Sequence, residues 1–295
     1  MKDAERIELH AGGLRFGAYA QGEGPVVLCL HGFPDHARSY REQLPALAEA
    51  GYRAIAPTMR GYEPSSQPRD GRYYLVDLAE DVIAWIDELG ERQVSIVGHD
   101  WGALTAQVVA LRAPERVRCM VTMAVPHLRR MGAGWREVAG RQLRNSWYVA
   151  FFQLRGLADW VVERDDFAFI EWLWRRWSPG WELPQDEWDQ LEATFAQPGV
   201  RRAALGYYRC NFGSLRAASR GIGATAGRSS VPTLLMTGER DGCVDTRLHD
   251  FGDWRGDFVG EAKVVRVAGA GHFLHQERGE AVNREIVAWL GEHAG

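Results

Sequence analysis

The sequence predicts an α/β protein with a mostly parallel sheet that is interrupted by a long helical insertion. Short apolar runs bounded by Gly or Pro alternate with segments of helical periodicity, which is the pattern of strand–helix–strand units. Between about residues 126 and 230 this alternation stops and only helix-like segments occur. Eight of the twelve tryptophans lie in that stretch. We therefore expect the insertion to cover apolar surface of the core.

The strands are predicted from short runs that are apolar or alternate in polarity. Residues 6–9 and 14–20, separated by Gly12-Gly13, predict an N-terminal hairpin. Short, mostly apolar runs follow, as expected where helices cover both faces of a parallel sheet. These runs are residues 26–30, 53–57, 94–97 and 121–125, and after the insertion 232–237 and 263–268.

The helices are predicted from apolar spacing and from their end signals. Apolar residues recur at helical spacing from Leu75 to Leu89 and stop at Gly90, a residue type favoured just after a helix. We expect the core to span residues 1–126 and 231–295 and a helical cap to span 127–230. Further helices are predicted at 103–113, 135–153, 166–177, 200–212 and 279–291.

Composition and charge exclude several classes of protein. The chain is 46% hydrophobic and 25% charged, which excludes a disordered or collagen-like chain. A formal net charge of −4 argues against a nucleic-acid partner, because such a surface must neutralise phosphates. No run of about 18 apolar residues predicts a membrane span, and the first residues lack the apolar segment of a signal peptide. Four cysteines without a CxxC pair suit a reducing compartment, so we expect a cytoplasmic protein.

The strongest catalytic motif is Gly98-His99-Asp100-Trp101-Gly102, between a predicted strand and a predicted helix. Small residues two positions before and after a central nucleophile mark a sharp strand-to-helix turn. Here the central residue is Asp100, whose carboxylate at a helix N-terminus is stabilised as the anion and can attack a carbon atom. An esterase or lipase would need Ser at this position. The alternative is that Asp100 only caps the helix.

Two further residues complete a candidate triad. Asp241 and His272 each follow a predicted strand, so nucleophile, acid and histidine occur in the chain order of hydrolases. Because the carboxyl ends of parallel strands lie at one edge of a sheet, we expect the three to meet there. Asp245 is the second candidate for the acid, with a less suitable spacing.

An oxyanion hole is predicted from two backbone N–H groups. The segment His31-Gly32-Phe33-Pro34 follows another predicted strand and can direct the Phe33 N–H at the site of reaction. The Trp101 N–H, just after the nucleophile, supplies the second donor.

No cofactor motif is recognisable. Gly221-Ile222-Gly223 follows no predicted strand and therefore does not predict a dinucleotide loop, and there is no phosphate-binding loop. The nine histidines show no metal-ligand spacing. We expect neither a cofactor nor a metal, and no pattern assigns an oligomeric state.

Taken together, the motifs resemble the α/β-hydrolase superfamily and, within it, the epoxide hydrolase branch, over nearly the whole chain. This resemblance implies an α/β-hydrolase fold with an inserted helical cap and a triad of Asp100, Asp241 and His272. The matching segments, in order, are HGFP at 31–34, MRGY at 59–62, GHDWG at 98–102, the GxxD turn at 238–241 and GHFLHQE at 271–277.

The resemblance also implies two cap tyrosines that hold the epoxide oxygen. Tyr148 begins a segment similar to the Tyr-x-x-x-Phe-Gln pattern of epoxide hydrolases, and Tyr208 precedes Arg in a Tyr-Arg-x-Asn pattern. Tyr207 is adjacent, so the second position is Tyr208 or Tyr207.

The function that follows is hydrolysis of an apolar epoxide to a vicinal diol through a covalent aspartyl ester, with water as the second substrate. Haloalkane dehalogenases share HGxP and GHDWG and are the enzyme alternative, but Phe33 replaces the Asn found in many of them. A catalytically silent ligand-binding protein is the other alternative, and such a protein has no need of Asp100 with His272.

Overall fold

The fold is organised around one sheet of eight strands in the order β1-β2-β4-β3-β5-β6-β7-β8. A computed structural model describes residues 3–133, 135–213 and 227–293; for residues 131–133 and 135–137 it describes the backbone alone. β1 pairs with β2 and β2 with β4 antiparallel, and every other pairing is parallel. The strands are β1 (Glu5–Ala11), β2 (Leu14–Gln21), β3 (Val26–Leu30), β4 (Arg53–Pro57), β5 (Val94–His99), β6 (Val117–Met123), β7 (Thr233–Gly238) and β8 (Ala262–Val267).

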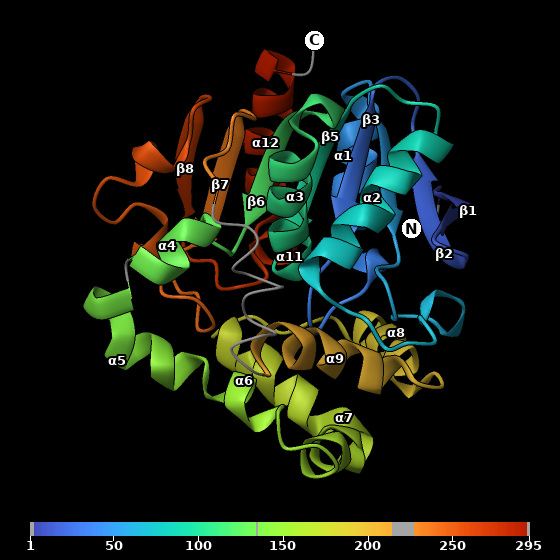
Figure 1. Cartoon of the computed structure of the whole chain (residues 1–295), viewed down its shortest axis with the longest axis vertical. Coiled ribbons are helices and arrows are strands. Elements are labelled where there is room, and N and C mark those ends of the chain that lie inside the picture. Colours follow the sequence, from blue (N-terminus) through green and yellow to red (C-terminus); the bar gives the residue numbers. More distant parts are fainter. Residues whose placement is uncertain (1–2, 134, 214–226, 294–295) are drawn as a thin grey trace.

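Helices cover both faces of the sheet (Figure 1). Successive residues of a strand point to opposite faces, so a strand that is covered on both faces must be apolar throughout. In β3, Leu28 packs in a cluster with Val82, whereas its neighbour Val27 packs in a second cluster with Leu44 and Ile286. The covering helices are α2 (Leu75–Glu88) and α3 (Trp101–Arg112) on one face and α1 (Gln43–Glu49) and α12 (Gly279–His293) on the other.

The chain between β6 and β7 forms a helical layer over one end of the sheet (Figure 1). The Trp174 ring stacks on Phe273 with ring centroids 3.5 Å apart, and its indole N–H donates to the Pro34 carbonyl. The Trp177 carbonyl accepts from the N–H groups of Gly242 and His272. These contacts join the layer to the loops at the ends of the strands. Its helices are α4 (Leu128–Ala133), α5 (Trp135–Asn145), α6 (Trp147–Phe151), α7 (Leu157–Trp177), α8 (Gln185–Ala196) and α9 (Val200–Phe212).

The architecture matches the predicted class, with local differences. The predicted helix at 135–153 is two helices, α5 and α6, and the helix predicted from 166 begins earlier, at Leu157. Within α7 the backbone departs from helical angles at residues 164–167. The domain bounds at 126/127 and 230/231 stay a prediction, and the Gly221-Ile222-Gly223 segment lies outside the described residues. Among the described residues, no helix combines the length and apolar character needed to span a membrane.

Candidate active site

Asp100 occupies a sharp turn between β5 and α3. Its backbone is at φ 51° and ψ −117°, a strained region for a residue with a side chain. A Cβ added to Gly98 would lie 2.5 Å from the Gly102 carbonyl oxygen, and one added to Gly102 would lie 1.9 Å from the Leu30 carbonyl oxygen. The two glycines are therefore needed because strand, turn and helix approach one another backbone to backbone.

The Asp100 side chain is directed at the site and does not cap its helix. No hydrogen bond joins the side chain to the first turn of α3 in the described structure. Instead, the Phe33 N–H donates to Asp100 Oδ1 at 2.8 Å. The Trp101 N–H belongs to the first turn of α3, where N–H groups lack partners within the helix. The geometry thus favours the functional interpretation of Asp100 over the capping one.

His272 lies between two carboxylates. Its Nδ1 is 3.0 Å from Asp241 Oδ2, and its Nε2 is 3.7 Å from Asp100 Oδ2. Burial alone would lower the pKa of His272, but the charges of Asp241 and Asp100 outweigh it and raise the pKa to about 10. The ring is therefore a cation at neutral pH when both acids are ionised.

Asp241 is held by its own turn, and Asp245 is engaged elsewhere. The N–H groups of Cys243 and Val244 donate to Asp241 Oδ1 at 2.7 and 2.9 Å. Arg247 binds both carboxylate oxygens of Asp245 and lowers the pKa of that group. The structure thus pairs His272 with Asp241, the first of the two predicted acids.

The two cap tyrosines line a cavity of about 430 Å³ together with Asp100. The Tyr148 hydroxyl is 3.3 Å from Cys243 Sγ, and the buried Tyr208 hydroxyl has no partner among the described residues. The Tyr207 hydroxyl donates to the Arg60 carbonyl at 2.7 Å, so it is already occupied. Of the two neighbouring tyrosines, Tyr208 is the one placed to meet a ligand. The apolar part of the cavity wall includes Leu104, Val125, Leu143, Val149, Phe212 and Leu248.

A larger cavity, of about 650 Å³, lies on the opposite side of α9. It is lined by residues such as Tyr73, Arg202 and Cys210 and by no member of the triad. Volume alone would therefore place the site wrongly. The convergence of Asp100, His272 and the two tyrosine hydroxyls identifies the smaller cavity as the candidate site.

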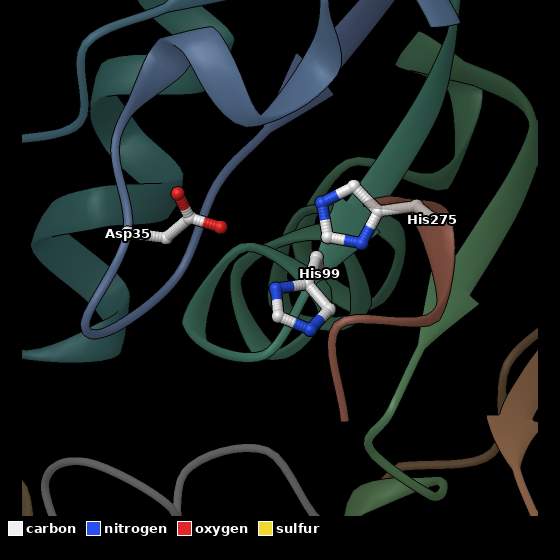
Figure 2. Close-up of side chains that lie close together, drawn as sticks. All are labelled: Asp35, His99 and His275. Carbon is white, nitrogen blue, oxygen red and sulfur yellow. The ribbon is translucent and has the colours of Figure 1, made fainter. Parts of the chain in front are cut away.

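Asp35, His99 and His275 form a buried Asp–His–His group (Figure 2). One possible ligand atom from each lies within 4.8 Å of the others, a donor set that can hold a divalent cation. The ring centroids of His99 and the triad residue His272 are 4.9 Å apart. The His99 Nε2–H donates to the His272 carbonyl at 2.9 Å, which leaves Nδ1 deprotonated in the neutral ring. Burial lowers the pKa of His99 to about 3, so the ring is neutral. Positions 35, 99 and 275 share no local spacing, so the sequence carries no signal for this group.

The fold and the site together define a class. Asp100, Asp241 and His272 follow β5, β7 and β8 of a mostly parallel sheet in the chain order of the α/β-hydrolases, beneath a helical layer.

Comparisons with known proteins agree with this α/β-hydrolase class. The family described as alpha/beta hydrolase fold matches residues 25–278. The chain is 31% identical to epoxide hydrolase 3 of Siraitia grosvenorii, covering 97% of this chain and 98% of that one, and 30% identical to epoxide hydrolase A of Mycobacterium tuberculosis, covering 94% of each. The crystal structure of an epoxide hydrolase from Vigna radiata superposes with a TM-score of 0.84 at 27% identity over 99% of both chains. The protein belongs to the α/β-hydrolase family, in the branch that contains the epoxide hydrolases, and the predicted fold class is confirmed.

Proposed function

We propose that the protein hydrolyses apolar epoxides to vicinal diols through a covalent ester on Asp100, with no cofactor. The observation that carries the proposal is a buried carboxylate at the strained turn, facing a largely apolar cavity that also contains the hydroxyls of Tyr148 and Tyr208. A volume of about 430 Å³ suits a small organic molecule. The names of relatives, several of them epoxide hydrolases, support the same reaction.

In the first step an Asp100 oxygen attacks a ring carbon, and the carbon–oxygen bond of the epoxide breaks. The leaving alkoxide stays on the substrate and needs hydrogen-bond donors as its charge develops. Burial raises the pKa of Tyr148 and Tyr208 well above the usual value, so both hydroxyls carry protons to donate. One of them transfers its proton to the alkoxide, and the product of this step is a hydroxyalkyl ester.

In the second step His272 acts as the base. Ester formation removes the charge of Asp100, one of the two carboxylates that raise the pKa of His272. The pKa of the ring therefore falls once the ester exists, and Nε2 can accept a proton from water after losing its own to solvent or to the tyrosinate. Asp241 holds Nδ1–H and orients the ring.

The same step needs an oxyanion hole at the ester carbon. Hydroxide attacks that carbon, and the N–H groups of Phe33 and Trp101 stabilise the negative oxygen that forms. The Phe33 N–H already lies 2.8 Å from Asp100 Oδ1. Collapse of this intermediate expels the second diol oxygen, which takes the proton that His272 accepted from water. The Asp100 carboxyl then passes its proton to His272, which restores the carboxylate and the charged ring.

A single turnover in heavy-oxygen water tests the proposal. With enzyme in excess over an aryl or alkyl epoxide, we expect the first diol to be unlabelled and Asp100 to carry the heavy oxygen. Label in the first diol would mean that water attacks the epoxide directly. Halide release from haloalkanes without any diol from epoxides would assign the chain to dehalogenation.

A further inference from the structure

The two tyrosines of the cavity differ in what they touch. The Tyr208 hydroxyl has no partner among the described residues, whereas the Tyr148 hydroxyl lies 3.3 Å from Cys243 Sγ. Cys243 is a free thiol, 2% exposed, and it lines the same cavity as Asp100. A sulfur atom thus lies next to one of the two groups that would meet the epoxide oxygen.

The backbone of Cys243 holds this thiol in place. Its N–H donates to Asp241 Oδ1 at 2.7 Å, and its carbonyl accepts from Gln142 Nε2 at 3.1 Å. The same turn therefore positions the triad acid and the sulfur. Because both backbone groups are bonded, the Cys243 backbone is fixed, and its Sγ lies beside the Tyr148 oxygen.

The chemistry of the pair favours a relay when substrate is present. Sulfur is a weak acceptor, and an epoxide oxygen is a stronger one, so the Tyr148 O–H turns to the epoxide when it binds. The thiol can then donate its S–H to the Tyr148 oxygen, which gives the chain S–H to O–H to epoxide oxygen. Burial keeps the pKa of Cys243 well above its usual value, so the S–H proton is present.

We infer that Cys243 is a positioning residue for epoxide opening, acting through Tyr148 and resting on the function proposed above. Its thiol orients and polarises the Tyr148 hydroxyl toward the epoxide oxygen. Hydrogen-bond chains strengthen each member by roughly 10–30%. A positioned donor is worth about 10²–10³ in rate. Because free energies scale with the logarithm of the rate, 10–30% of that effect corresponds to a change of about 2- to 8-fold in the rate of ester formation.

The test compares variants at Cys243 in single-turnover experiments, with ester formation followed by acid quench and intact-protein mass. Cys243→Ala and Cys243→Val both remove the S–H, and Val also excludes a replacing water. Both should slow ester formation about 2- to 8-fold and leave ester hydrolysis unchanged. Cys243→Ser keeps a donor and should restore the rate. Cys210→Ala is the matched control, because Cys210 lines the cavity on the other side of α9.

A double-mutant cycle shows whether the effect passes through Tyr148. In a Tyr148→Phe background, Cys243→Ala should change nothing further, while in a Tyr208→Phe background it should keep its full effect. An equal loss in both backgrounds, or Cys243→Ser as slow as Cys243→Ala, overturns the inference and leaves the proposed function standing. A wild-type enzyme that makes diol without an ester overturns the proposed function itself, and the relay with it.

Discussion

Tyr207 and Tyr208 are adjacent in the chain, and the structure predicts opposite consequences for removing their hydroxyls. Tyr208→Phe removes a buried hydroxyl that lines the cavity and has no partner among the described residues. Ester formation should slow by about 10²–10³-fold, because a donor to the developing alkoxide is lost. The free energy of unfolding should not fall, since no protein hydrogen bond is broken.

Tyr207→Phe should lower the free energy of unfolding and leave the rate of ester formation nearly unchanged. Its hydroxyl donates to the partly buried Arg60 carbonyl at 2.7 Å, and the loss leaves that carbonyl without this donor. Loss of such a hydrogen bond costs about 0.5–1.5 kcal/mol of unfolding free energy. The rate of ester formation should stay within about twofold of the wild type, because the hydroxyl does not face the cavity with Asp100.

Two measurements separate the pair: single-turnover ester formation, and denaturant unfolding of the same preparations. If Tyr207→Phe loses the chemical step while Tyr208→Phe keeps it, the assignment of the second donor is reversed. Wild-type rates in both variants would remove the α9 tyrosines from the mechanism.

The remaining predictions concern the triad, the buried Asp–His–His group and the nucleophile turn. His272→Gln should accumulate an ester, seen as protein heavier by one substrate mass, and the absence of any adduct would contradict its role as the base. The pKa of His272 in the folded protein, about 10, lies above the unfolded value of about 6.5. Its contribution to stability is therefore complete below about pH 6.5 and is lost as the pH rises toward 10. The free energy of unfolding should fall over this interval, and Asp241→Asn should make that fall smaller. Dialysis against a chelator should leave turnover unchanged, because no proposed step uses the Asp–His–His group, whose hydrogen bond to the triad is from His99 to the backbone carbonyl of His272; a loss that added zinc restores would refute this. Gly102→Ala should prevent normal folding or cost more than about 4 kcal/mol, because its Cβ would lie 1.9 Å from the Leu30 carbonyl oxygen; wild-type stability of this variant would contradict the described turn.

Local signals in the sequence predicted much of the core. The strand predictions at 26–30 and 53–57 match β3 and β4, and the helix predicted at 200–212 matches α9. These signals are periodicity, turn residues and apolar runs, which act over a few residues. The prediction of a strand at 121–125 was wrong in its bounds, since β6 runs from Val117 to Met123. The second residue of β6 is the half-buried Arg118, and this charged residue interrupts the apolar run that would have marked the start of the strand.

Some elements gave too little local signal to be predicted. Helix α1 is only seven residues long and contains Pro45, and α8 lies largely exposed on the cap with three buried residues. Their positions depend on packing against neighbouring elements, which outweighs weak intrinsic preference.

For the site, the sequence by itself determined which residue types follow which strands, and hence the candidates Asp100, Asp241 and His272. Only the tertiary structure decided which groups meet. Neighbouring residues of a helix point about 100° apart, so the rotation of α9 against the core directs Tyr208 into the cavity and Tyr207 onto Arg60. The contact of Tyr148 with Cys243 and the convergence of the Asp–His–His group likewise join segments far apart in the chain. Such contacts follow from how the elements pack, and no local spacing encodes them.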